Sequence, residues 1–203
     1  MNLKPLVAAL ALVAPAAFAA NTYDIDPSHS SAQFSVRHMM VTNVRGEFTK
    51  MSGTLTLDEK NLKNSKVEAV IDAKTINTRE AKRDEHLRSP DFFDVEKHPQ
   101  ITFTSTEFKK AGKEKYKVKG NLTMRGVTKP VVLDVEMPSA EAKDPWGNVK
   151  RGATATTTVN RKDFGLTWNQ ALETGGVMVG EEVKITLDLE FNKKAEAPTA
   201  ANK

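Results

Sequence analysis

Alternating apolar and polar residues run through most of the chain and predict strands with one buried and one solvent-facing side. Over residues 183–191 every second residue is apolar, and the residues between them are lysine, threonine, aspartate and glutamate. Residues 116–124 and 32–38 alternate in the same way. Further strands are expected at 44–48, 53–57, 67–73, 100–105, 131–137 and 152–159. About eight or nine strands of this kind indicate either an antiparallel sandwich or a closed barrel.

One segment, residues 77–87 (NTREAKRDEHL), lacks this alternation and contains good helix formers. Asn77 is the expected N-cap, because Glu80 follows it at the spacing of a capping box. Ser89-Pro90 is expected to end the helix. Hairpin turns are expected at 110–113 and 125–126, where glycine lies between two strands. The pattern therefore predicts a β structure with one inserted helix.

The two ends of the chain differ from this body. Residues 1–19 combine one early lysine, an apolar run over 6–18 and small residues at 17 and 19, which predicts a signal peptide cleaved after Ala19. The run is shorter than the ~20 apolar residues that a membrane span requires. Residues 193–203 are small and polar, and are expected to form a disordered tail. We therefore expect one folded domain over 20–192, exported to a bacterial periplasm or the cell exterior.

Composition narrows the classes of partner. Apolar residues make up 39% of the chain and the mean hydropathy is −0.46, so a protein with several membrane spans is excluded and no stable membrane insertion is expected. The net charge of +4 comes from interleaved charges, 30 basic and 26 acidic, and does not predict a nucleic-acid partner. The chain has no cysteine, which excludes disulfides, thiolate metal sites and a cysteine nucleophile.

Motifs for catalysis or cofactor binding are absent from the sequence. The four histidines (29, 38, 86 and 98) are not spaced as zinc ligands. No G-x-S-x-G motif is found, and Gly175-Gly176 fits neither the dinucleotide-binding nor the phosphate-loop spacing. We therefore expect no metal, no cofactor and no catalytic residue. A catalytic triad assembled from distant positions stays open as an alternative.

Small residues occupy several positions that alternation places on the inner face. If the strands close into a barrel, small residues leave room for one slender ligand, provided that no large side chain fills the space. A filled core, with glycines serving curvature, is the alternative that the pattern leaves open. The small inner positions are Ala32, Gly46, Gly53, Ala69, Ala73, Gly120, Ala153 and Ala155.

Five motifs, in order along the chain, resemble those of the YceI-like family of exported lipid-binding proteins. Together they extend the resemblance over about residues 23–192. The motifs are DPSHS at 26–30 with FSVRH at 34–38, RDEHLRSPDFFD at 83–94, PQITF at 99–103, GNLTMRGVT at 120–128 and NRKDFGL at 160–166.

This resemblance implies an all-β fold: an eight-stranded antiparallel, lipocalin-like barrel with one helix inserted between strands. It also implies that the interior holds a long polyisoprenoid or similar lipid, that there is no catalysis, and that homodimers are frequent. A secreted hydrolase using the same cavity, and a stress or adhesion module without a ligand, are the alternatives. His38 is the expected contact for a polar head group. The residues expected around the lipid are Phe34, Val36, His38, Phe48, Phe92, Phe93, Ile101, Phe103, Leu122, Met124, Leu133, Phe164 and Leu166.

Overall fold

A computed structural model describes residues 20–137, 140–173 and 175–195. The expected signal peptide at 1–19 and residues 196–203 of the expected tail lie outside the described residues. Within them, the one α-helix is α1 (Ala81–Arg88), and the 3-10 helices are η1 (Leu62–Asn64), η2 (Ala73–Thr75) and η3 (Arg161–Phe164). The strands are β1 (Asn21–Ile25), β2 (Ser31–His38), β3 (Thr42–Phe48), β4 (Met51–Leu57), β5 (Lys66–Asp72), β6 (Ile76–Asn77), β7 (Gln100–Gly112), β8 (Lys115–Met124), β9 (Val127–Glu136), β10 (Ala142–Lys143), β11 (Val149–Asn160) and β12 (Val179–Lys193).

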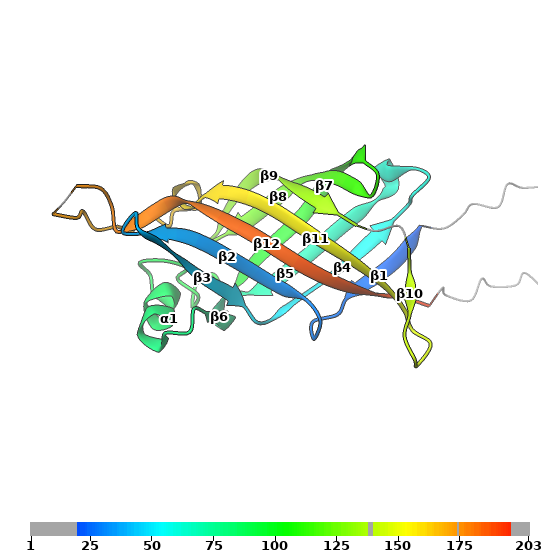
Figure 1. Ribbon diagram of the computed structural model, residues 1–203, viewed down its shortest axis with the longest axis horizontal. Coiled ribbons are helices and arrows are strands. Elements are labelled where there is room, and N and C mark those ends of the chain that lie inside the picture. Colours follow the sequence, from blue (N-terminus) through cyan, green and yellow to red (C-terminus); the bar gives the residue numbers. More distant parts are fainter. Residues whose placement is uncertain (1–19, 138–139, 174, 196–203) are drawn as a thin grey trace, which may run out of the picture.

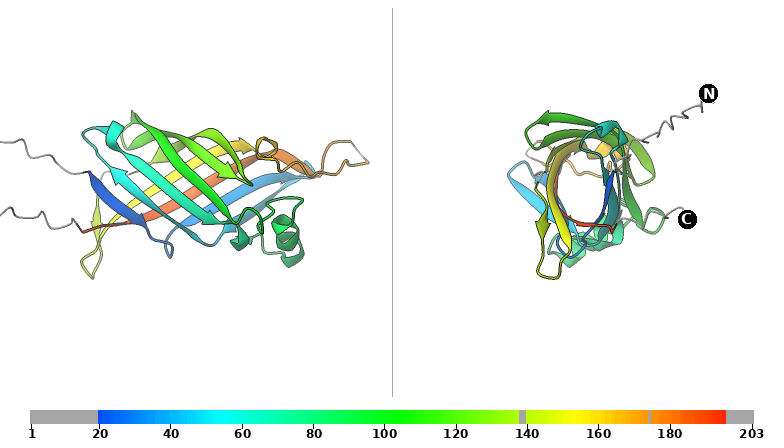
Figure 2. Two further views of the ribbon diagram at one scale, coloured as in Figure 1. Left: turned by 180° about the vertical axis from the view of Figure 1, so that it is seen from behind. Right: turned by 90° about the vertical axis from the view of Figure 1, so that its right-hand side faces the viewer.

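The strands form a closed barrel, because β11 pairs with both β9 and β12. β1 and β2 pair one after the other with β12, so they occupy one position in the ring. β3 and β4 take the next position, and β5 with β6 the one after it. Counted this way, the ring has eight antiparallel positions, and each neighbours the one before it along the chain. The predicted eight-stranded barrel with one inserted helix is confirmed, and Figure 2 shows the strands encircling the barrel axis.

The strand pair β11–β12 shows how the alternating pattern builds the wall. Eleven residue pairs join these two strands without interruption. On the inner face Ala155 lies opposite Leu187, and on the outer face the Thr154 hydroxyl donates to Asp188 over 3.1 Å. Since successive side chains point to opposite faces, apolar residues meet inside and polar residues meet in solvent.

Two-residue turns join the strands at 113–114 and 125–126. Arg125 and Gly126 have φ values of 50° and 74°, as a type I′ hairpin turn requires. The predicted turn at 125–126 is therefore in place. The other turn lies later than predicted, because β7 continues to Gly112 and Glu114 takes the left-handed conformation with φ 57°.

The helix is shorter than predicted and its N-cap is a different residue. Glu80 is the N-cap of α1, and its carboxylate accepts from the backbone N–H groups of Lys82 and Arg83. Asn77 is not the cap, because β6 pairs it with Glu47 of β3 and holds it in extended conformation. Its side chain accepts instead from the Arg79 backbone N–H at 2.9 Å.

The two ends of the barrel carry different elements (Figure 1). The end that we call the helix end carries α1, the β2–β3 turn and the described residues 165–173 and 175–178. The opposite end, which we call the terminal end, holds the starts of β1 and β5 and the end of β12. Among the described residues, no helix is long and apolar enough to cross a membrane.

Candidate ligand-binding cavity

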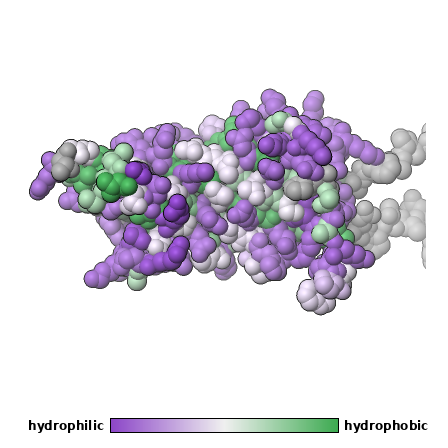
Figure 3. Space-filling view, in the orientation of Figure 1, coloured by the Kyte–Doolittle hydropathy of each residue, from purple (hydrophilic) through white to green (hydrophobic). Residues whose placement is uncertain are grey.

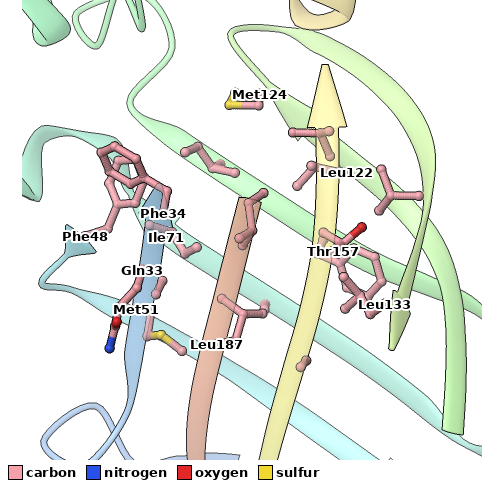
Figure 4. Close-up of a pocket in the computed structure, with 18 of the residues that line it drawn as sticks. Gln33, Phe34, Phe48, Met51, Ile71, Leu122, Met124, Leu133, Thr157 and Leu187 are labelled. Atoms are coloured by element: carbon pink, nitrogen blue, oxygen red, sulfur yellow. The ribbon is translucent and has the colours of Figure 1, made fainter. Parts of the chain in front are cut away.

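The barrel encloses a cavity of about 220 Å³. Every position of the ring contributes inward-facing side chains to its wall, and Leu87 of α1 together with Phe92 and Phe93 lines it at the helix end. Figure 4 shows side chains from several strands converging on this space. The polar side chains in the wall are Gln33, Thr102, Tyr116, Thr157 and Arg161; the rest of the wall is apolar.

The exposure of the inner side chains argues for a hollow interior. Phe34, Phe103, Leu122 and Leu187 lie within strands and line the cavity, yet they are half-buried rather than buried. In a filled core, large apolar side chains at such positions contact neighbours on all sides and lose nearly all their exposed surface. These side chains keep part of their surface free because it borders the cavity.

Two of the small inner residues do not leave the room that their size suggests. A β-carbon at Gly46 would overlap the ring of Phe34, and one at Gly120 would overlap the ring of Phe103. The phenylalanine rings therefore occupy the space beside these glycines, so the condition that no large side chain fills the space is not met at these two positions. Other small residues do border the cavity, namely Ala32, Ala69, Ala153 and Ala155.

Eleven of the thirteen residues expected around a lipid line the cavity. Whether these residues contact a lipid stays a prediction. They are Phe34, Val36, Phe48, Phe92, Phe93, Ile101, Phe103, Leu122, Met124, Leu133 and Leu166.

His38 and Phe164 do not form part of the cavity wall. His38 is the last residue of β2, beside a register shift in β12 between Val179 and Val183 that interrupts the alternation. Phe164 belongs to η3 rather than to a strand and is buried in the packed core. The expected placement of these two residues is therefore wrong.

The sequence reasoning missed other residues of the wall. Arg161 is the least expected, because arginine is rarely buried. The apolar ones lie on strands whose alternation was recognised, and that alternation was the signal that could have found them. They include Val118, Val131, Val183, Ile185, Leu187, Leu189 and Phe191.

Aromatic side chains gather at the helix end of the cavity. The ring of Phe48 packs between Phe34, at 5.8 Å, and Phe93, at 5.6 Å between ring centroids. Phe92 packs against Trp168 at 5.3 Å, and the His86 ring lies 5.0 Å from each of these two rings. The α1 segment and the segment that carries Trp168 are thereby joined over this end of the barrel.

Arg161 is a buried cation at the same end, only 4% exposed. Its guanidinium donates to the carbonyls of Gly180 at 2.8 Å, Trp168 at 2.9 Å, Val179 at 3.2 Å and Leu166. Burial lowers the pKa of this guanidinium. Because the four carbonyls belong to two segments, Arg161 ties η3 both to the segment before β12 and to the first residues of β12.

The terminal end is closed by a polar cluster. Arg151 pairs with Glu59 at 2.8 Å and lies over the ring of Tyr23, 5.6 Å from its centroid. The Tyr23 hydroxyl donates to Glu141 over 2.6 Å. Burial, reinforced by this hydrogen bond, raises the pKa of Tyr23 to about 12, and the same bond lowers the pKa of Glu141. Tyr23 and Arg151 lie outside the cavity wall, so the cluster closes this end beyond the apolar space.

A group of potential metal ligands, Asp26, His29 and Glu190, also lies toward the terminal end. The ammonium of Lys150 already pairs with Asp26 at 3.1 Å and with Glu190 at 2.9 Å. Hydrogen bonds from Ser28, His29 and Lys150 hold the pKa of Asp26 far below its usual range. Lys150 thus already pairs with both carboxylates, and the group is an ion-pair network.

The same segment places a serine, a histidine and an aspartate together, but not as a catalytic triad. The Nδ1 atom of His29 faces both the Ser28 hydroxyl, at 3.2 Å, and Asp26, at 3.1 Å. A triad requires the serine and the aspartate on different nitrogens of the ring. Ser28 moreover donates directly to Asp26 at 2.5 Å. This geometry does not activate the serine, and none of the three residues lines the cavity.

A comparison with protein-family models identifies the family of the chain. The family model described as the YceI-like domain matches residues 23–191. The chain belongs to the YceI-like family. A UPF0312 protein of Pectobacterium carotovorum is 43% identical over 161 residues, which cover 79% of this chain and 83% of the relative.

Solved structures of similar proteins share the barrel. The YceI protein of Campylobacter jejuni has 31% identity and a TM-score of 0.66, covering 78% of this chain and 90% of its own. A protein of Saccharophagus degradans, described as a polyisoprenoid binding domain, has 16% identity and a TM-score of 0.62, covering 85% of this chain and 98% of its own. At such low identity the second comparison establishes the fold alone.

Proposed function

We propose that this YceI-like protein binds a long-chain isoprenoid-like lipid, such as a polyprenyl quinone, inside the barrel and carries it outside the cytoplasm. The observation that carries the proposal is the hollow interior, whose wall is almost entirely apolar and whose large side chains keep free surface toward the cavity. Apolar surface of this kind is costly to hydrate and favours an apolar occupant.

The energetics of an isoprenoid suit such a carrier. Burying one CH₂ group is worth about 0.8 kcal/mol, so each five-carbon unit favours leaving water by roughly 3 to 4 kcal/mol. A chain of several units therefore has negligible solubility in an aqueous compartment without a protein around it. The realised affinity is far below the sum of these terms, because the ligand and the side chains lose conformational freedom on binding.

The side chains of the wall are suited to a slender and flexible chain. Met51 and Met124 are unbranched and adapt their shape to what they contact. Phe34 and Phe103 are half-buried and line the cavity, so part of each ring can contact an occupant. The fold is shared with the Saccharophagus degradans domain described as polyisoprenoid binding, which supports the same class of ligand here.

Binding without catalysis is favoured over the hydrolase alternative. The serine, histidine and aspartate that meet at the terminal end do not line the cavity, and their geometry does not activate the serine. We propose that the first nineteen residues direct the protein out of the cytoplasm and are cleaved after Ala19. A homodimer remains part of the proposal, as the family resemblance implies.

The direct test is organic extraction of the purified protein followed by mass spectrometry. The expected result is a prenyl lipid in near-stoichiometric amount with the native protein, and none after mild denaturation and washing. A protein that carries no lipid and takes up no added prenyl quinone would overturn the proposal.

Uptake can be followed by the fluorescence of Trp168, whose ring contacts Phe92 of the cavity wall. The chain has two tryptophans, and Trp146 is 85% exposed, so Trp146→Phe isolates the signal of Trp168. Saturable quenching by a prenyl quinone is expected. Addition of the quinone ring without its prenyl tail is the control, and it should quench weakly and without saturation.

A further inference from the structure

The turn between β2 and β3 consists of three exposed apolar residues at the helix end of the barrel. Met39, Met40 and Val41 are 43%, 54% and 75% exposed. They join His38 to Thr42, which face each other across the hairpin. Tight turns are usually built from glycine, asparagine and aspartate, which hydrogen-bond to water or to the backbone. Three apolar residues at such a position expose hydrophobic surface without any benefit to the turn.

The backbone of this turn makes the choice of residues more unusual. Met39 and Met40 have φ values of 49° and 60°, in the left-handed region. That region is unfavourable for residues other than glycine, asparagine and aspartate. The two methionines therefore retain a conformational cost that glycine or asparagine would remove. Local strain combined with exposed apolar surface is typical of a site that contacts something else.

A second segment enlarges the apolar surface. The Met39 backbone N–H donates to the carbonyl of Met178 over 2.7 Å, which fixes the turn beside the segment before β12. In that segment Ala171 and Leu172 lie beside Gly176 and Val177, since the Leu172 N–H donates to the Gly176 carbonyl and Ala171 forms a bridge with Val177. Figure 3 shows hydrophobic residues gathered at this end of the molecule. We call the following residues the apical patch: Met39, Met40, Val41, Leu172, Val177 and Met178.

The apical patch is continuous with the cavity. Val36 and Val179 line the cavity wall. Val179 pairs with His38, the residue directly before Met39, and directly follows Met178 of the patch. Along β2, only Arg37 and His38 lie between Val36 of the wall and Met39 of the patch, and at the start of β12 Val179 of the wall is adjacent to Met178 of the patch.

We propose that the apical patch docks on the surface of a lipid bilayer, where lipid passes between the membrane and the cavity. The inference rests on the proposed function, because a prenyl lipid has to leave a membrane before it enters the barrel. Methionine side chains adapt to an irregular acyl surface. Arg37 is exposed at the base of the patch and donates to the Met40 carbonyl over 2.8 Å, so it adds a cation that favours anionic lipid.

The size and shape of the patch favour a bilayer over another protein. A stable protein interface of standard size takes roughly 20–30 residues on each side. The patch has six residues, and they lie on the tip of a hairpin and an adjoining loop at one end of the barrel (Figure 1). A small convex apolar tip inserts readily between lipid head groups, whereas it buries little area against a rigid partner.

The test compares the full chain with the triple variant Met39→Asn, Met40→Gly and Val41→Ser in vesicle flotation. The new residues suit a turn with positive φ, so the variant should unfold at the same temperature as the wild type or above it. With phosphatidylcholine vesicles, the variant is expected to bind at least tenfold more weakly than the wild type. Including phosphatidylglycerol should raise wild-type binding several-fold.

Trp146→Ser is the matched control, because Trp146 is an exposed apolar residue in the turn between β10 and β11, at the terminal end. This variant should bind vesicles as the wild type does. Equal binding by the wild type and the triple variant would overturn the proposal. So would a wild-type dimer that the triple variant abolishes while neither protein binds vesicles, since the patch would then be a contact between copies of the chain.

Lipid content separates this inference from the proposed function. If extraction recovers as much lipid from the triple variant as from the wild type, but the variant exchanges lipid with vesicles at least tenfold more slowly, the carrier function and the docking surface both hold. If the wild type holds lipid and does not bind vesicles, the bilayer proposal alone fails. If the wild type holds no lipid while vesicle binding still depends on the patch, the carrier function fails and the docking surface stands.

Discussion

The ring of Phe103 lies against Gly120, in the space that a β-carbon of residue 120 would occupy. Gly120 is on β8, beside β7 that carries Phe103, and both strands form part of the cavity wall. Because glycine has no side chain, the Phe103 ring can occupy this space beside β8. In the same way, Gly46 on β3 leaves space for the ring of Phe34 on the neighbouring strand β2.

Gly120→Val should therefore reduce lipid uptake. The added side chain overlaps both the Phe103 ring and the Thr104 backbone carbonyl, so the ring is pushed aside and the two strands must shift. We expect uptake to fall at least tenfold, with a loss of about 3 kcal/mol in the free energy of unfolding. Quinone titration and urea unfolding measure the two effects. Gly152→Val is the control, because the nearest atom to a β-carbon there is 3.9 Å away. Unchanged uptake in Gly120→Val would show that the ring position does not govern the cavity.

Part of this arrangement could be predicted from the sequence. Strict alternation identifies which face of a strand is buried, and this suffices to place Phe34, Phe103 and Leu122 in the wall. It does not say that Phe103 fills the space beside Gly120, because that contact depends on the register between two strands. Nor does alternation identify Arg161, because its four hydrogen bonds join two segments whose closeness no sequence pattern indicates.

The errors at His38 and Phe164 have a related cause. Alternation does not hold at the end of β2, where the register shift in β12 interrupts it, or at residues 161–164, which form a 3-10 helix. The closure at the terminal end was not predicted at all. Tyr23 and Glu141 are 118 residues apart in the chain and meet only because the barrel closes.

Phe103→Asp should eliminate lipid uptake. A carboxylate in an apolar cavity either stays charged and holds water there or is protonated at a cost, and both outcomes disfavour a hydrocarbon chain. Val132→Asp is the matched control: it makes the same kind of change at an exposed position on β9 and should leave uptake intact.

Loss of folding in Phe103→Asp would imitate loss of binding, so Phe103→Ala is measured beside it. The smaller side chain widens the cavity, and we expect this variant to retain uptake. If Phe103→Asp takes up lipid as the wild type does, and its circular dichroism is that of a folded barrel, then Phe103 is not part of the binding surface.

Arg161→Met should destabilise the helix end. The change leaves four carbonyls without their donor in a buried site, and we expect a loss of about 3–5 kcal/mol in the free energy of unfolding. Arg161→Lys should restore little of this free energy, because one ammonium does not reproduce the planar set of donors. The rate of backbone amide hydrogen exchange in Arg161→Met should rise over residues 166–168 and 179–180. Arg45→Met, at an exposed position on β3, is the control and should cost less than about 0.5 kcal/mol. Full stability of Arg161→Lys would mean that the charge alone matters.

The tyrosine at the terminal end should make stability fall at high pH. The pKa of Tyr23 is raised to about 12 in the folded protein, against about 10 in the unfolded chain. Between these values the unfolded state releases a proton that the folded state keeps. The contribution of Tyr23 to stability is therefore complete below about pH 10 and is lost as the pH rises toward 12, by up to about 1.4 kcal/mol per pH unit. Tyr23→Phe should flatten this decline.

Urea unfolding of the two proteins between pH 9 and pH 11 measures the difference in slope. Other groups that titrate in this range, lysines above all, are shared by both proteins and cancel in the comparison. Tyr116→Phe removes the other tyrosine of the chain and controls for the loss of a hydroxyl group. Because the pKa of Tyr23 is raised mainly by burial, a parallel pair of pH profiles would mean that water reaches this hydroxyl and that the cluster with Glu141 and Arg151 does not seal the terminal end.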